Sequence, residues 1–166
     1  GVRMRFKALL LSRVAGGLLA LVLSLAAGAA PILPGAVFPA LALEDQHGRT
    51  VSTSANTRLV LFAADKAASD LINEVLAARP AGVLDGLGAV YFADISAMPA
   101  LVTRMFALPA LREMPFAVGL GREAGQLADL PRQKGAATVV RLVDGKVASI
   151  EYARNVGQLM QAIGLK

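Results

Sequence analysis

The sequence predicts an α/β sandwich in which a mixed central sheet has helices on both faces. Strand-like apolar runs alternate with helix-like periodic segments from residue 58 to about residue 120. A two-stranded hairpin and one last helix then close the chain. Alternating elements form parallel strands with crossover helices, and a terminal hairpin adds antiparallel strands. The 166 residues have room for one domain of ordinary size.

The N-terminal 29 residues have the pattern of an export signal. Basic residues extend to Arg13, an apolar stretch follows from residue 14 to 25, and small residues lead to an Ala-x-Ala site ending at Ala29. The alternative is an uncleaved anchor, with residues 8–30 as the contact with the membrane. We therefore expect a signal peptide or anchor at 1–29, a linker at 30–37 and a domain at 38–166. The domain is predicted to be periplasmic or secreted, or tethered to the inner membrane if the signal is retained.

The positive charge of the chain belongs to this N-terminal segment. The whole sequence has 17 basic and 12 acidic residues, but four basic and no acidic residues precede residue 30. The remainder has 13 basic and 12 acidic side chains, a net charge of +1. Because a nucleic-acid-binding domain needs a basic surface, binding of nucleic acid is not expected.

The first half of the domain contains a hairpin, a buried strand and a helix. Residues 38–43 alternate weakly, residues 44–49 have turn chemistry, and residues 50–51 return as a strand. The continuous apolar run at 58–63 predicts a strand buried on both faces. Asp65 is placed to cap a helix over 66–78, with Ala67, Leu71, Val75 and Ala78 as its inward stripe.

The second half predicts two more strands, a helix, a hairpin and a final helix. Glycines at 82–88 indicate a loop before a strand at 89–95. Residues 98–112 are helical in pattern, with Pro109 kinking or ending the helix and the side chains at 101, 105, 108 and 111 on one buried face. Residues 116–120 form a third strand candidate and 121–135 a loop. The Asp144-Gly145 turn predicts a hairpin over 138–152, and Asn155 caps the last helix.

Several of these segments resemble the thioredoxin-like superfamily. Residues 135–147 (GAATVVRLVDGKV) resemble its C-terminal hairpin, with Thr138 at the family's threonine and Ala137 at its cis-proline. Residues 59–62 (LVLF) resemble the strand before the redox helix. The opening hairpin resembles the peroxiredoxin-like (AhpC/TSA) and SCO-like branch, and residues 93–99 (ADISAMP) resemble the YtfJ-like periplasmic proteins. The resemblance covers about residues 38–166 and implies a three-layer thioredoxin-like α/β/α sandwich.

The resemblance places the two redox cysteines near Ala67 and Asp70, but this chain contains no cysteine. Thiol–disulfide exchange and thiol-based peroxide reduction both require a thiolate, so these activities are excluded. The corresponding surface, which we call the vestigial redox face, is our candidate binding site. It consists of Asp65, Lys66, Ala67, Asp70, Ala136, Ala137 and Thr138. The alternative is that Asp65 and Asp70 only cap the helix and face solvent.

Metal and catalytic residues are weakly indicated. His47 is the only histidine, and a single imidazole does not complete a metal site. Met98 and Met105 lie seven residues apart and could bind Cu(I), although methionines on such a face more often fill core gaps. No serine hydrolase motif and no phosphate-binding loop is found, so we predict no catalytic residue and no cofactor.

Three functions are compatible with these observations. The first is a binding or accessory module of the bacterial envelope that captures a protein or peptide partner. The second is a non-thiol oxidoreductase or copper-binding periplasmic protein. The third is a structural envelope component held by an uncleaved signal. We expect the binding module.

Overall fold

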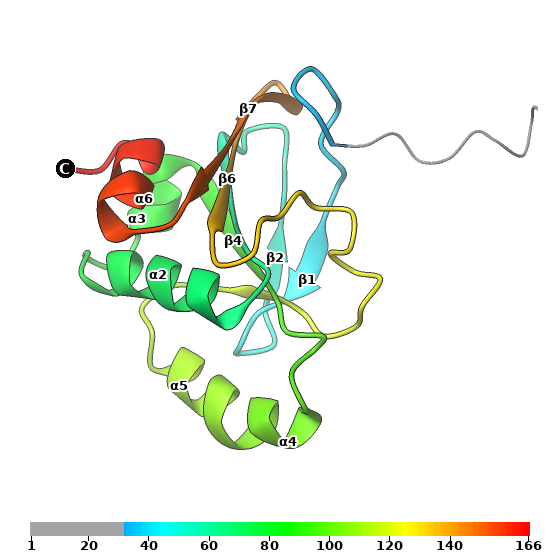
Figure 1. Cartoon of the computed structure of the whole chain (residues 1–166), viewed down its shortest axis with the longest axis vertical. Helices are drawn as coiled ribbons and strands as arrows, with labels where there is room; N and C mark the ends of the chain where they lie inside the picture. Colours follow the sequence, from blue (N-terminus) through cyan, green and yellow to red (C-terminus); the bar gives the residue numbers. More distant parts are fainter. Residues whose placement is uncertain (1–31) are drawn as a thin grey trace, which may run out of the picture. The chain divides into compact units, whose positions relative to one another are not determined.

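A five-stranded mixed sheet organises residues 32–166, the part of the chain that the computed structural model describes (Figure 1). Its strand order is β5-β4-β3-β6-β7. The strands β3, β4 and β5 are parallel, and β6 and β7 form an antiparallel hairpin against β3. Their bounds are β3 (Leu59–Ala63), β4 (Ala89–Asp94), β5 (Gly119–Gly121), β6 (Ala137–Val143) and β7 (Lys146–Ala153). The mixed sheet is as predicted, with the third strand shifted toward residue 121.

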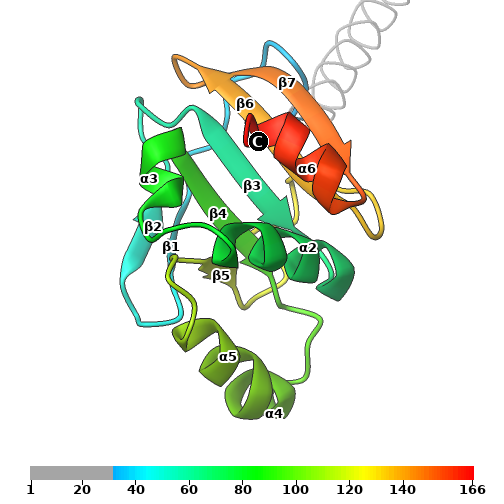
Figure 2. The ribbon, with the colours of Figure 1, turned by 90° about the vertical axis from the view of Figure 1, so that its left-hand side faces the viewer.

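The helices at 66–77, 83–87 and 156–163 pack against one face of this sheet (Figure 2). The helical segment at 100–112 lies beyond the ends of the strands and contributes Leu108 and Leu111 to the same core cluster. The crossovers from β3 to β4 and from β4 to β5 proceed in the same direction across the sheet. Because parallel crossovers are right-handed, both place their helices on the same face. The helices are α2 (Lys66–Ala77), α3 (Val83–Leu87), α4 (Ala100–Val102), the π-helix η1 (Thr103–Ala107), α5 (Leu108–Arg112) and α6 (Val156–Ile163).

The opposite face is covered by a hairpin and a loop, which corrects the expectation of helices on both faces. Strands β1 (Ala42–Glu44) and β2 (Thr50–Ser52) form the hairpin (Figure 1). Residues 122–135 cross the same face without forming a helix, and two of them, Leu127 and Leu130, bury their side chains against the sheet. Glycine, proline and polar residues dominate this segment, so it has too few apolar anchors for a packed helix. The sandwich keeps three layers, but its second outer layer is not helical.

Residues 32–37 belong to the folded unit and are not a free linker. The backbone N–H of Gly35 donates to Val147 O at 2.7 Å, and that of Phe38 donates to Gly145 O at 2.9 Å. Val37 forms a bridge with Lys146, and Ile32 packs against the buried cluster that includes Phe62 and Leu127. These contacts fasten the segment to the β6–β7 hairpin. The predicted signal or anchor at 1–29 lies outside the described residues, and no helix within 32–166 has the length and apolar character needed to cross a membrane.

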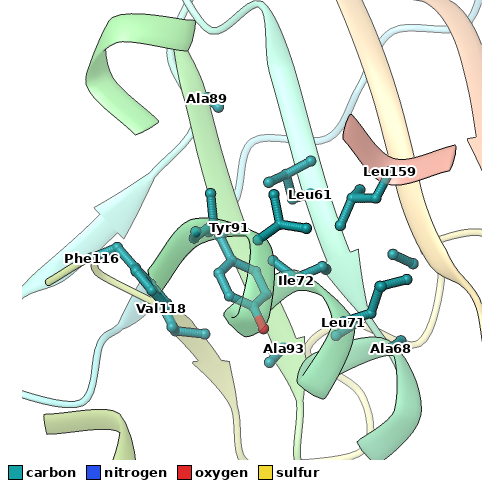
Figure 3. Close-up of a cluster of buried hydrophobic side chains, with 14 of the residues drawn as sticks. Leu61, Ala68, Leu71, Ile72, Ala89, Tyr91, Ala93, Phe116, Val118 and Leu159 are labelled. Carbon is teal, nitrogen blue, oxygen red and sulfur yellow. The ribbon is translucent and has the colours of Figure 1, made fainter. Parts of the chain in front are cut away.

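Tyr91 occupies the centre of the main core, on β4 (Figure 3). Its ring lies 6.1 Å from that of Phe116, and its hydroxyl donates to Asn73 Oδ1 at 3.0 Å. A buried tyrosine hydroxyl needs such a partner. Burial raises the pKa of Tyr91 well above its ordinary value; a hydrogen bond with Ser69 opposes the shift, and the charge of Asp70 adds to it.

Three local predictions need correction. The inward stripe of α2 is Ala68, Leu71, Ile72, Val75 and Leu76, whereas Ala67 and Ala78 are exposed. Residues predicted as a glycine loop form the short helix α3, which ends at Gly88 with a φ of 63°. The expected buried face of 98–112 is only half right, because Leu108 and Leu111 are buried but Leu101 and Met105 are 55% and 56% exposed.

Pro109 explains why the helix before it widens. Proline lacks the N–H that would bond to the carbonyl four residues earlier, and its ring crowds that carbonyl. The preceding turn is the π-helix η1, in which Leu108 N–H bonds to Thr103 O, five residues back. The wider turn keeps α4, η1 and α5 as one continuous helical segment and relieves the crowding.

Candidate functional site

A largely apolar groove of about 560 Å³ lies between α2 and the α4–η1–α5 segment. Its floor includes Ala93 and Ile95 at the end of β4, so it opens where the parallel strands end. Ligands of open α/β sheets commonly bind at this end of the strands. We call this hollow the α2–α5 groove.

One wall of the groove is the helix that the resemblance identifies with the redox helix. Asp65, Lys66 and Asp70 from the vestigial redox face lie on this wall together with Glu74. Lys66 Nζ and Asp70 Oδ2 form an exposed ion pair at 2.5 Å. Three carboxylates and one ammonium line the wall, and no other lining residue is charged, so the groove has a net charge of −2.

The opposite wall is apolar and exposed. Val102 and Phe106 project from α4 and η1, and Phe106 is 67% exposed. Leu101 and Met105 extend the same apolar surface outside the groove. A monomeric protein rarely exposes several large apolar side chains side by side, and such patches mark sites of interaction.

Methionines give this groove an adaptable lining. Met98 and Met114 line it, and Met105 lies on the adjoining apolar surface. A methionine side chain has three rotatable bonds and a polarizable sulfur, so it adjusts to ligands of different shape. Met105 is exposed, so it does not have the core-packing role that is usual for such methionines.

Asp65 joins the two segments of the vestigial redox face. Its Oδ1 accepts from the backbone N–H of Ala68 at 2.9 Å and caps α2, as predicted. Its Oδ2 accepts from the backbone N–H of Gly135 at 2.7 Å. The two segments, 70 residues apart, are therefore held side by side.

The second segment of that face offers no side-chain surface. Ala136, Ala137 and Thr138 are buried, and Ala137 pairs with Ala153 in the sheet. The Thr138 hydroxyl donates to Pro131 O at 2.9 Å. Ala67 is exposed but does not line the groove. Binding at the remaining residues stays a prediction.

The weak metal candidates are not gathered at one place. His47 is exposed in the β1–β2 turn, Met98 lines the α2–α5 groove, and Met105 lies outside its lining. Within residues 32–166 no group of three or more His, Asp or Glu side chains is placed to hold a metal ion.

Sequence reasoning missed the apolar wall of the groove. The signal was present, since apolar residues occupy nearly every side of the helix over 100–111. A short helix at the rim of a domain can bury only one side. The excess of apolar residues over buried positions therefore indicated an exposed apolar surface.

No protein-family profile and no curated protein sequence matches the chain. Among solved structures, peroxidoxin BcpB from Mycobacterium tuberculosis is 13% identical, with a TM-score of 0.52 over 79% of this chain and 94% of that one. A peroxiredoxin-like protein from Aquifex aeolicus is 12% identical, with a TM-score of 0.51 over 82% and 88%.

The chain has a thioredoxin-like fold. The thioredoxin domain of a thiol-disulfide oxidoreductase from Bacteroides vulgatus shares it as well, at 13% identity and a TM-score of 0.50 over 79% of this chain and 98% of that domain. This thioredoxin-like chain differs from what those names describe in having no cysteine. At this level of identity the likeness establishes the fold, and function must be argued from the site.

Proposed function

We propose that this protein is an exported thioredoxin-fold binding module that captures an apolar segment of a protein or peptide partner in the bacterial cell envelope. The observation that supports this most directly is the α2–α5 groove with Phe106 exposed on its wall. A groove between two helices suits an amphipathic segment that lays its apolar side chains into it.

Several large apolar side chains beside the groove have no cover within the described residues. Leu101, Val102, Met105 and Phe106 are all exposed on one helical segment. Burying one such side chain contributes roughly 1.5–3 kcal/mol. Two or three of them offset much of the entropy lost on association, which is enough for a specific although modest affinity.

The absence of cysteine agrees with a binding role at this place. The groove lies against the helix where the resemblance puts the redox cysteines, at about Ala67 and Asp70. The chain therefore presents a thioredoxin-like surface beside that helix without thiol chemistry. A fold without its reactive groups can still present a surface to a partner.

The experiment is site-specific photocrosslinking in the envelope fraction. A photoreactive amino acid replaces Ala77, which is exposed and lines the groove, and in a control it replaces Ala148, which is exposed on β7. We expect one reproducible adduct from position 77 and none from position 148. Phe106→Ser in the same chain should reduce that adduct at least fivefold.

A matched substitution separates binding from general surface effects. Val143 is 63% exposed on β6, outside the groove, so Val143→Ser removes similar apolar exposure elsewhere. It should leave the adduct unchanged. Equal crosslinking from positions 77 and 148, or an adduct that survives Phe106→Ser, would refute the proposal.

Export itself is a separate part of the proposal. It rests on the basic and apolar pattern of residues 1–29. Mass measurement of the protein recovered from cells distinguishes cleavage after Ala29 from a retained anchor. Metal analysis of the same preparation tests the alternative of a copper-binding protein, which predicts stoichiometric copper.

A further inference from the structure

A second hollow adjoins the α2–α5 groove and contains two arginines. It has a volume of about 410 Å³ and lies against α4, η1 and the end of β5. We call it the arginine pocket. Its lining includes Arg104 from η1 and Arg122 directly after β5, together with Ile95, Met98, Thr103 and Leu108. No carboxylate lines it.

Neither guanidinium has a hydrogen-bond or ion-pair partner among residues 32–166. Five other arginines among the described residues have such side-chain partners, whereas Arg49 and Arg58 do not. Arg132 pairs with Asp94 at 3.0 Å, Arg112 donates to Gln46 O at 3.1 Å, and Arg154 donates to Lys134 O at 2.9 Å. Two unpartnered cations that line one hollow repel each other, and their combined field attracts an anion.

The remaining lining defines what the anion is attached to. Ile95, Met98 and Leu108 give the pocket an apolar floor, so a strongly hydrated free anion would leave that floor without contacts. A guanidinium binds a carboxylate through two parallel hydrogen bonds. The chemistry therefore suits a carboxylate carried on an apolar group.

We propose that the arginine pocket binds the carboxyl terminus of a peptide whose last side chain is apolar. Ile95 and Met98 line both the pocket and the α2–α5 groove, so the two hollows adjoin at these residues. A segment lying in the groove can therefore end in the pocket. This connection to the groove rests on the proposed function, whereas the carboxylate site itself does not.

The test uses a small probe of the peptide terminus. N-acetyl-L-leucine has an apolar side chain and a carboxylate that is ionised at neutral pH, and N-acetyl-L-leucinamide is its uncharged match. Titrated into ¹⁵N-labelled protein at low salt, the acid should give saturable amide shifts around Thr103 and Arg122. The amide should bind at least tenfold more weakly.

Substitutions assign the effect to the two arginines. Arg104→Gln and Arg122→Gln should each weaken binding of the acid about tenfold, because each removes a charge-assisted hydrogen bond. Arg49→Gln makes the same change in an exposed turn outside the pocket and should alter the affinity less than twofold. Equal binding of acid and amide, or equal effects of all three substitutions, would overturn the assignment.

Two further measurements separate a carboxylate site from a general anion site, and the pocket from the groove. If inorganic phosphate displaces the acid at an equal or lower concentration, the pocket is a general anion site and the peptide proposal fails. Phe106 does not line the pocket, so Phe106→Ser should leave the affinity for N-acetyl-L-leucine unchanged while it weakens partner crosslinking. Failure of the carboxylate site is thereby separated from failure of the groove.

Discussion

The carboxylate of Asp65 accepts a hydrogen bond from the backbone N–H of Gly135 at 2.7 Å, across 70 residues of sequence. With its other oxygen it caps α2 through Ala68 N–H. One side chain thus begins the helix of the groove wall and fixes the approach to β6. The position of that wall depends on both bonds.

Asp65→Ala removes both bonds and should lower the free energy of unfolding by about 2–3 kcal/mol. Asp65→Asn keeps an oxygen that can cap α2, but its amide nitrogen cannot accept from Gly135, so the loss should be about half as large. Urea unfolding monitored by circular dichroism measures both. If Asp65→Asn is as stable as the wild type, the Gly135 bond contributes nothing; if it is as unstable as Asp65→Ala, the cap contributes nothing.

Gln46 connects the opening hairpin to the end of the α5 segment. Its Nε2 donates to Leu111 O at 3.1 Å and to Phe116 O at 2.7 Å, and its Oε1 accepts from Val118 N–H at 2.9 Å. Gln46 is buried, so Gln46→Leu removes three buried hydrogen bonds to the backbone and should cost about 3 kcal/mol or more.

Gln126 is the matched control for this change. Its Oε1 also accepts from two backbone N–H groups, those of Arg122 and Glu123, but it is exposed. Water can replace the lost bonds there, so Gln126→Leu should cost less than about 1 kcal/mol. Similar urea midpoints for both variants would mean that burial does not decide the effect.

The ionisation of Asp94 makes the stability of the protein change with pH in the acid range. Burial by itself would raise the pKa of this carboxyl, but hydrogen bonds from Ser96 and the paired Arg132 outweigh burial and lower the pKa below its ordinary value. A lowered folded-state pKa stabilises the protein above the unfolded value of about 4, and the contribution is lost as the pH falls through the folded value.

Asp94→Asn should therefore be less stable than the wild type at pH 7, and the difference should shrink below about pH 4. Urea midpoints at pH 7, 4 and 3 measure it, with Asp129→Asn, an exposed carboxylate outside any ion pair of the described residues, as the control. A difference that stays constant down to pH 3 would contradict the role of the ionised carboxylate.

Arg132 makes a further set of contacts with the loop on the second face. It lies 5.0 Å from the centre of the Phe62 ring, and its Nη2 donates to Leu127 O at 2.5 Å. These contacts hold residues 122–135 against the sheet, where no helix forms. The Asp94–Arg132 pair therefore also stabilises the loop that takes the place of a helical layer.

Tyr91→Phe removes the hydroxyl that donates to Asn73 Oδ1 and should cost about 1 kcal/mol at neutral pH. Burial raises the pKa of Tyr91, so the wild type should lose stability as the pH rises above about 10, where tyrosine in the unfolded chain ionises. The variant should lack this alkaline component. Tyr152→Phe, at the other tyrosine, is the control, and an equal alkaline loss in Tyr91→Phe would contradict the assignment.

Local chemistry in the sequence was enough to predict most elements of the fold. Continuous apolar runs predicted β3 and β4 because strands buried on both faces need no polar alternation. Asp144 and Gly145 predicted the β6–β7 turn, and both adopt the positive φ that this turn requires. Asp65 and Asn155 both cap helices as expected, since a cap depends on neighbouring residues alone.

Tertiary structure decided which face each segment covers and which apolar residues stay exposed. The single helical face follows from the handedness of two successive crossovers, which no local pattern encodes. Phe106 and Leu108 are equally apolar in sequence, but only Leu108 points to the core, because the turn widened before Pro109 and the sheet edge beneath α5 set the rotation of the helix. The cysteine-free composition excluded thiol chemistry from the sequence alone, whereas the groove that replaces it as the candidate site exists only where α2 and α5 meet.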